Sequence, residues 1–252
     1  MPSPLILLTN DDGVHSSGID ALARALSSVG EVFVVAPDRE MSACSHGLTI
    51  KNPLRAERLG PNRFSVDGTP ADCVSVGLLR LVPRRPALVV SGINRGANLG
   101  DDIFYSGTVG GAREAVFQGI PAIAMSLVTR SAEDDFEPAA AVAARVAKFV
   151  LEHGLPRRTL LNVNVPPGQP LGLAVTTQGV REHEGQVTEG LDPRHQPYYW
   201  IEETREAWAK DEESDIAAVR QGLVSVTPLH TDMTHREYRG HLSALSSPLG
   251  LR

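Results

Sequence analysis

Hydrophobic and polar positions alternate in blocks along this chain. Five short apolar runs, several rich in β-branched residues, lie at 5–8, 32–36, 87–90, 121–126 and 160–165. Runs of this kind are typical of strands buried in a parallel sheet. Between them lie segments with helical spacing, such as Ile19, Leu22, Ala23 and Leu26. We expect helices over 17–29, from the cap Thr69 to about residue 82, from Ser106 onward and over 138–153, and therefore an α/β fold built on a parallel sheet.

Two stretches interrupt this alternation. In 42–66 we expect two short strands, 48–50 and 63–66, joined around the turn residues 60–62. After residue 170 the pattern changes to a strand near 174–177, a polar irregular stretch at 179–208, a helix at 214–221, a strand at 223–227 and a polar tail. The predicted organisation is an α/β core over 1–170 and a β/loop extension over 171–252.

Polar residues follow three of the predicted strands. The first ends in Asn10-Asp11-Asp12-Gly13, the loop after the second contains Ser42, and Asn94 follows the third. Ligands of open α/β sheets bind at the carboxyl ends of the strands. Adjacent carboxylates repel each other unless a cation or protons intervene. This all-oxygen set suits Mg²⁺, Mn²⁺ or Ca²⁺ better than zinc; the alternative is that the aspartates only cap a helix.

The most unusual stretch is 91–111, which holds six glycines. A long loop inside a compact domain is usually functional or disordered, and glycines let backbone amides approach a ligand. Ser106-Gly107-Thr108 then opens a helix, and a helix N-terminus is a favourable anion site. We predict a phosphate-binding cradle here, although a single hydroxyl could serve only as a cap.

Composition narrows the classes of function. The 252 residues, 42% of them hydrophobic, suffice for one sizeable core. A net charge of −6 without a basic stripe argues against a nucleic-acid polymer as partner. No stretch reaches the roughly 18 apolar residues that span a membrane, and the first apolar run is too short for a signal peptide. We therefore expect a cytoplasmic protein with no membrane partner, in which Cys44 and Cys73 are unbridged and unreactive thiols.

Several ordered motifs resemble one known family. They are Asn-Asp-Asp-Gly at 10–13, Ala-Pro-Asp-Arg at 36–39 with Ser42, Gly-Thr-Pro-Ala-Asp-Cys-Val at 68–74, Ser-Gly-Ile-Asn-Arg-Gly-Ala-Asn-Leu-Gly at 91–100 and Ser-Gly-Thr at 106–108, with further likeness at 161–166 and 225–229. Together these motifs resemble the SurE family, the stationary-phase survival proteins also called nucleoside 5′-monophosphate phosphohydrolases. The resemblance covers most of the chain, and the ordered set is far more specific than any single motif.

The resemblance implies a Rossmann-like domain with helices on both faces and one divalent cation per subunit, with Mg²⁺ or Mn²⁺ as the first candidates and Ca²⁺ as a further one. The family's metal ligands fall here on Asp11, Asp12, Ser42 and Asn94, and its phosphate-binding residues on Asn98, Ser106, Gly107 and Thr108. Members hydrolyse 5′- and 3′-nucleotides, and some cleave short polyphosphate. They form homodimers or homotetramers that exchange C-terminal segments. Some members have His before the Ser-Gly-Thr motif, where this chain has Tyr105; a neutral Tyr is a poor proton donor near neutral pH, so the general acid stays open.

Two routes for the reaction remain open. In the first, Asp11 or Asp12 positions or deprotonates a water molecule. In the second, one of these aspartates attacks phosphorus and forms an aspartyl-phosphate. We favour water, because both carboxylates are expected to hold the metal.

Rival interpretations rest on other features. A dinucleotide-binding oxidoreductase would need G-x-G-x-x-G at the first turn, which reads Asn-Asp-Asp-Gly instead. A non-catalytic nucleotide or phosphate sensor could use the same cradle. His230, His235 and His241 could form a second metal site, although solvated surface is the more usual role of such histidines. The cluster Tyr198-Tyr199-Trp200 could stack on a base, but we favour a subunit interface.

Overall fold

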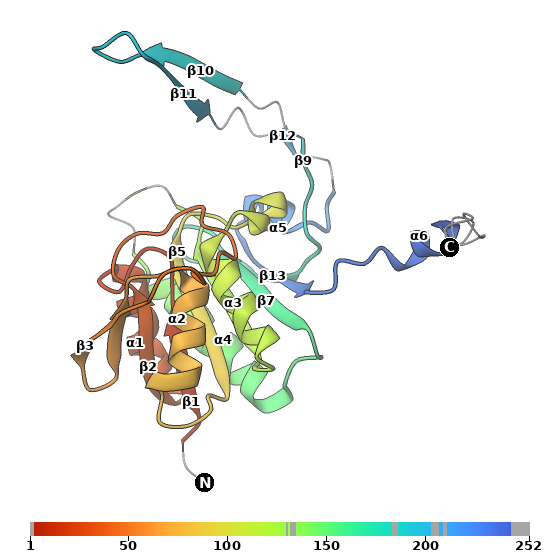
Figure 1. Ribbon diagram of the computed structural model, residues 1–252. Helices are drawn as coiled ribbons and strands as arrows, with labels where there is room; N and C mark the ends of the chain where they lie inside the picture. Colours follow the sequence, from red (N-terminus) through yellow and green to blue (C-terminus); the bar gives the residue numbers. More distant parts are fainter. Residues whose placement is uncertain are drawn as a thin grey trace, which may run out of the picture.

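A single large sheet forms the centre of the protein (Figure 1). The computed structural model describes residues 3–129, 131, 135–182, 186–202, 207–208 and 211–242. Within these residues, nine strands pair in the order β3-β4-β2-β1-β5-β6-β7-β13-β8. Their bounds are Leu5–Thr9 (β1), Glu31–Pro37 (β2), Ala56–Gly60 (β3), Arg63–Val66 (β4), Leu88–Arg95 (β5), Ala122–Leu127 (β6), Thr159–Val165 (β7), Gly172–Val175 (β8) and Leu223–His230 (β13).

The central strands run parallel, so their carboxyl ends meet at one edge. β1 pairs in parallel with β2 and β5, and β6 pairs in parallel with β5 and β7. Only toward the two sides do antiparallel pairs occur, between β3 and β4 and between β13 and β7. The sheet is therefore mixed but mainly parallel, and the predicted α/β class is confirmed.

Helices cover both faces of the sheet, as predicted (Figure 1). The helical segments are Ser17–Leu26 (α1), Pro70–Val76 (α2), the π-helical Gly77–Leu81 (η1), the 3₁₀-helical Gly100–Phe104 (η2), Gly107–Phe117 (α3), Glu137–His153 (α4), Asp215–Arg220 (α5) and Arg236–Arg239 (α6). α1 and α4 pack on the face that carries Ile6 and Leu8. α2 and α3 pack on the face that carries Leu5 and Leu7. Successive side chains of a strand point to opposite faces, so one apolar run supplies both cores.

Three local predictions were wrong. Residues 48–50 form no strand, because Thr49 is tied to the Asp72 carboxylate while Leu48 and Ile50 face solvent; the partner of β4 is Ala56–Gly60 instead. The stretch 91–111 is not one long loop, because β5 continues to Arg95 and η2 and α3 follow. α1 ends at Leu26 rather than near residue 29. The hydroxyls of Ser27 and Ser28, just after this end, donate hydrogen bonds to preceding backbone carbonyls.

The stretch 179–208 was expected to be irregular but contains paired strands. Gln186–Leu191 (β10) and Pro197–Glu202 (β11) form an antiparallel hairpin, and Arg181–Glu182 (β9) pairs with Ala207–Trp208 (β12). The Asp192 carboxylate closes the hairpin turn by accepting the amides of Arg194 and Gln196. Figure 1 shows this hairpin projecting away from the main sheet.

The chain after residue 170 forms part of the main sheet as well as the projecting hairpin. β8 and β13 complete the main sheet, and α5 packs beside β13. The division at residue 170 into a core and an extension stays a prediction, and residues 243–252 of that extension lie outside the described residues. Across the described ranges, no helix is long and apolar enough to cross a membrane.

Candidate active site

The end of β1 turns sharply and places two carboxylates at the sheet edge. The Asn10 amide group donates to the Gly13 carbonyl at 2.9 Å and to Ser16 Oγ at 2.8 Å, and Ser16 caps α1. Gly13 has φ +93, a conformation that favours glycine. The turn therefore lets Asp11 and Asp12 lie off the strand, as their predicted joint role requires.

Asp11 is buried against the start of α3. Its Oδ2 accepts the Thr108 amide at 3.1 Å, and its Oδ1 accepts the Thr108 hydroxyl. Burial, joined by the Asp12 charge and opposed by the Thr108 hydrogen bonds, raises the pKa of Asp11 to about 6. Thr108 thus orients this carboxylate, a role that sequence reasoning had not assigned to it.

Asp12 lies in an open cavity beside Ser42. The cavity measures about 450 Å³ and is lined by residues that include Asp12, Ser42, Glu40 and Arg95. Asp12 Oδ2 accepts the Arg95 amide at 3.0 Å, and the Ser42 hydroxyl donates to Glu40 Oε1 at 2.7 Å. Burial raises the pKa of Asp12, while the Arg95 amide and charge oppose the rise. The negative charge of this edge is therefore incompletely compensated by the protein itself.

Asn94 belongs to the same edge. It occupies the end of β5, next to Arg95, and its amide group donates to the Gly96 carbonyl at 2.9 Å. β2, β1 and β5 are neighbours in the sheet, so Ser42 and the two aspartates follow strand ends adjacent to the end of β5, within which Asn94 lies rather than after it as expected. No group of three or more His, Cys, Asp or Glu side chains suited to a metal occurs among the described residues; the predicted set has only two carboxylates.

The first turn of α3 forms the other side of the site. Ser106 caps the helix by accepting the Val109 amide at 3.0 Å. A methyl group at Gly107 would lie 2.8 Å from Cys44 Sγ and 3.0 Å from Asp11 Oδ2, so only glycine fits between them. Both the capping role and the proximity to Asp11 are therefore present at this helix start.

Asn98 lies in a buried polar network rather than in open space. Its side-chain amide donates to Ser126 Oγ at 2.8 Å, and its backbone amide donates to Asn164 Oδ1 at 2.8 Å. The Asn98 carbonyl accepts the amide groups of Asn162 and Asn164. The sequence signal that we overlooked is the pair of amides two residues apart in a buried strand, which places both on one face of β7.

The other singled-out residues lie as follows. The Tyr105 side chain is 62% exposed at the end of η2. Burial, with the charge of Asp11, raises the pKa of Cys44 to about 11, and Cys73 is buried, so both thiols are protonated at neutral pH. His230 and His235 bond to nearby backbone groups, and His241 stacks on Tyr238.

Fold and site together define a doubly wound α/β protein with two adjacent aspartates at the carboxyl edge of its sheet, one of them against a helix N-terminus. A family model described as "Survival protein SurE" matches residues 6–185. The chain therefore belongs to the SurE family, and the resemblance predicted from its motifs is confirmed.

Individual relatives agree over nearly the full length. A protein of Citrifermentans bemidjiense named 5′-nucleotidase SurE is 56% identical over 233 residues, covering 91% of this chain and 94% of the relative. A protein of Geobacter sulfurreducens with the same name is 53% identical, covering 91% and 89%. The crystal structure of the SurE protein from Aquifex aeolicus superposes with a TM-score of 0.87 at 45% identity, covering 97% of this chain and 100% of that one.

Proposed function

We propose that the protein is a metal-dependent 5′-nucleotidase, a hydrolase that cleaves nucleoside 5′-monophosphates to nucleoside and phosphate. Its relatives are named 5′-nucleotidase SurE, which supports this activity. The observation that carries it in this chain is the pair Asp11 and Asp12, whose pKa values burial raises, beside the start of α3.

The proposed divalent cation would be held by Asp11, Asp12, Ser42 and Asn94. All four offer oxygen, which suits Mg²⁺ or Mn²⁺, and Ca²⁺ less specifically. A cation beside the two aspartates would favour their ionised forms and offset the cost of burying them. When bound, such an ion would supply a Lewis acid that polarises phosphoryl oxygens and lowers the pKa of water.

The chain's own groups supply the remaining chemistry. Asp11 or Asp12 positions the attacking water and accepts its proton. Ser106 and Gly107 hold the phosphate at the start of α3, where a helix N-terminus favours an anion. The Ser106 hydroxyl can donate a hydrogen bond to the phosphate while its oxygen caps the helix. Thr108 holds the Asp11 carboxylate in place through two hydrogen bonds. Asn98, through its buried hydrogen bonds, holds the segment that leads to the phosphate cradle.

The test of this activity is phosphate release from a panel of 5′-nucleotides, 3′-nucleotides and short polyphosphates. The panel is run in EDTA and then with added Mg²⁺, Mn²⁺ or Ca²⁺. We expect the 5′-nucleotides to be the best substrates, with 3′-nucleotides and short polyphosphate as slower ones. Binding of nucleotide without release under any metal would instead favour a nucleotide or phosphate sensor.

Water, rather than an aspartate, is the proposed nucleophile. Asp11 is held by both Thr108 donors, which restrains it from moving toward phosphorus. Rapid quenching during turnover of a radiolabelled nucleotide should leave no label on the protein. Stable label on Asp11 or Asp12 would overturn this choice in favour of an aspartyl-phosphate.

We also propose a cytoplasmic homodimer or homotetramer whose subunits exchange C-terminal segments. The projecting β10–β11 hairpin exposes large apolar side chains, including Tyr199, Trp200 and Ile201. Exposed apolar patches of this kind mark interaction sites. A subunit contact through the hairpin would cover them.

A further inference from the structure

Residues 42–49, which we call the strap, lie across the starts of α2 and α3. Ser45 donates its amide to the Tyr105 carbonyl at 2.9 Å and its hydroxyl to the Phe104 carbonyl at 2.6 Å. The Ser45 carbonyl lies so close to α3 that a Cβ at Gly110 would be 2.3 Å from it. Ser42, a proposed metal ligand, is the first residue of the strap, so its position depends on the contacts that hold this segment.

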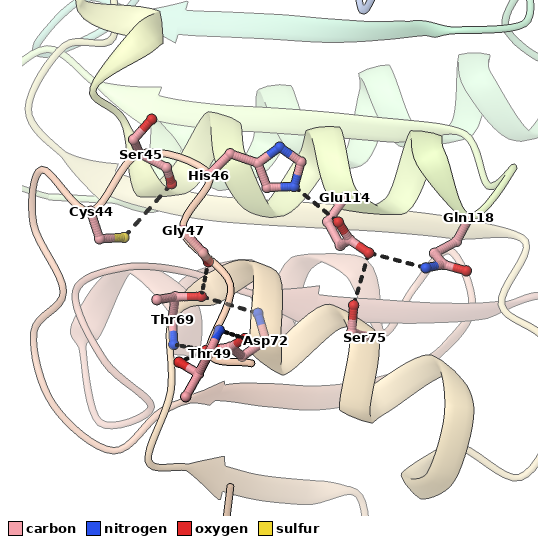
Figure 2. A network of polar contacts seen from close by, with 10 residues as sticks. All are labelled: Cys44, Ser45, His46, Gly47, Thr49, Thr69, Asp72, Ser75, Glu114 and Gln118. Carbon is pink, nitrogen blue, oxygen red and sulfur yellow. Dashed lines mark hydrogen bonds and ion pairs between the residues drawn. The ribbon is translucent and has the colours of Figure 1, made fainter. Parts of the chain in front are cut away.

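The far end of the strap is fastened to α2 (Figure 2). The Thr69 hydroxyl donates to the Gly47 carbonyl at 2.7 Å. The amide and hydroxyl of Thr49 donate to the Asp72 carboxylate at 2.9 and 2.7 Å. Asp72 and Thr69 also form the capping box of α2, so this end is part of a rigid helix start.

Between these two ends, His46 makes a buried side-chain contact with Glu114 of α3. His46 Nε2 lies 2.9 Å from Glu114 Oε2, and the two side chains are only 15% and 6% exposed. The other Glu114 oxygen accepts Ser75 Oγ at 2.8 Å and Gln118 Nε2 at 3.0 Å, as Figure 2 shows. The His46 ring also stacks on Phe117 at 5.3 Å. One carboxylate thus joins the strap, α2 and α3.

The strap's backbone depends on such contacts. Ala43 and Ser45 both have φ +54, in the left-handed region that non-glycine residues rarely adopt. Residues in this region persist only where the surrounding structure determines them. His46 follows directly after Ser45, so its contact with Glu114 lies next to a residue held in an unfavourable backbone conformation.

We infer that His46 and Glu114 are positioning residues that hold the strap against α3, so that Ser42 and the start of α3 face the same ligand. This inference rests on the proposed function, since it concerns the same site. Neither residue is proposed to contact the substrate. Their contact would act through Ser42 on a bound cation, and through Ser45 on the segment that precedes Ser106.

The test compares wild type with His46→Ala and His46→Gln in three measurements. These are amide hydrogen exchange of residues 41–49 in the metal-free protein, Mn²⁺ affinity by calorimetry, and kcat and KM for a nucleoside 5′-monophosphate. For His46→Ala we expect faster exchange confined to the strap, Mn²⁺ binding weakened by about 10-fold, and KM raised by more than kcat falls. A glutamine amide can donate to Glu114, so His46→Gln should recover most of the Mn²⁺ affinity.

His153→Ala is the matched control. His153 also stacks on a phenylalanine, Phe149, at 4.4 Å, but on α4 rather than beside the strap. It should leave all three measurements unchanged. Glu114→Gln is the second variant, and it should loosen the strap as His46→Ala does.

Two results would overturn the inference. One is unchanged strap exchange and Mn²⁺ affinity in folded His46→Ala and Glu114→Gln proteins. The other is an equal rise in exchange throughout α2 and α3, which would indicate general destabilisation. If wild type binds Mn²⁺ but hydrolyses no nucleotide, the proposed activity fails, whereas the exchange and affinity comparisons still decide the role of the strap.

Discussion

At the scale of single residues, Asp11 combines a role in the proposed chemistry with a cost in stability. The carboxylate is 5% exposed and is oriented by Thr108. Its folded pKa of about 6 exceeds the ordinary value of 3.8, chiefly because of burial. Folding in the absence of metal therefore takes up a proton between these two pH values, and above them it buries a charge.

We predict that Asp11→Asn stabilises the metal-free protein at pH 7.5 by roughly 1–3 kcal/mol. The stability that wild type gains from the protonated carboxyl is fully present below pH 3.8 and is lost as pH rises through about 6. The advantage of the variant should therefore grow with pH across this window. Urea unfolding in EDTA at several pH values measures it. An advantage that is absent at pH 7.5, or that does not change with pH, would contradict the assignment.

A substitution at Gly107 tests whether activity needs the close packing of α3 against Asp11 and the strap. A Cβ there would meet Cys44 Sγ at 2.8 Å and Asp11 Cβ at 3.0 Å. We predict that Gly107→Ala lowers kcat/KM for a 5′-nucleotide by about 100-fold, since a displacement of about 1 Å at a catalytic group has effects of this size. Gly60→Ala is the control, because its Cβ would make only an ordinary contact at 3.9 Å. Equal activity of the two variants would show that the contact is unimportant.

At the scale of elements, Asp215 connects the start of α5 to two distant segments. Its Oδ2 accepts the Gly100 amide at 2.9 Å, and its Oδ1 accepts the Gly179 amide at 3.0 Å. Gly100 opens η2, which leads directly to the candidate cradle. The segment after residue 170 therefore helps to shape the site.

We predict that Asp215→Ala lowers the free energy of unfolding by roughly 2–4 kcal/mol, because it leaves buried amides without an acceptor. It should also speed amide exchange at Gly100 and Gly179. Asp211→Ala, at an exposed position just before α5, should cost about 0.5 kcal/mol or less. A similar cost for both variants in urea unfolding would argue against a specific connection through Asp215.

The strands and helices of the core were predictable because local spacing encodes them. The apolar runs of β1, β2, β5, β6 and β7 and the apolar stripe of α1 need no knowledge of partners. That Asp11, Asp12 and Asn94 lie at one edge of the sheet could also be predicted, because parallel strand ends meet there; their role as metal ligands stays a prediction. The contacts of Thr49 with Asp72, Asn98 with Asn164, and Asp215 with Gly100 join residues 23, 66 and 115 positions apart. No local pattern specifies such pairs, so the contacts of the strap and the pairing of Asn98 with the two β7 amides could not be predicted.

At the scale of the whole molecule, the β10–β11 hairpin could not be predicted from the sequence, because its two strands pair with each other rather than with the main sheet. Its aromatic residues stand in a polar context, and without a buried face they show no inward-outward alternation. Trp200 and Ile201 are 65% and 86% exposed. Surfaces of this kind are explained more readily by a second subunit than by the fold of one chain.

We predict that wild type sediments as a dimer or a larger homo-oligomer and that the double variant Trp200→Ser, Ile201→Ser forms smaller assemblies. Removing two large apolar side chains takes away buried contact area at the proposed interface. Sedimentation velocity at several concentrations measures the change. The double variant Leu171→Ser, Val175→Ser, at exposed positions near β8, is the control. A monomeric wild type, or an unchanged distribution in the hairpin variant, would contradict the proposed role.

The most direct test of the whole account is phosphate release from a nucleoside 5′-monophosphate by wild type, Asp11→Asn and Asp20→Asn. Asp20 lies on α1 and pairs with Arg63, so it controls for the loss of a carboxylate elsewhere. We predict that Mn²⁺ restores release by wild type and Asp20→Asn after EDTA, and that folded Asp11→Asn is slower by about 1,000-fold or more. Release by Asp11→Asn at the wild-type rate, or no release by wild type with any divalent cation, would contradict it.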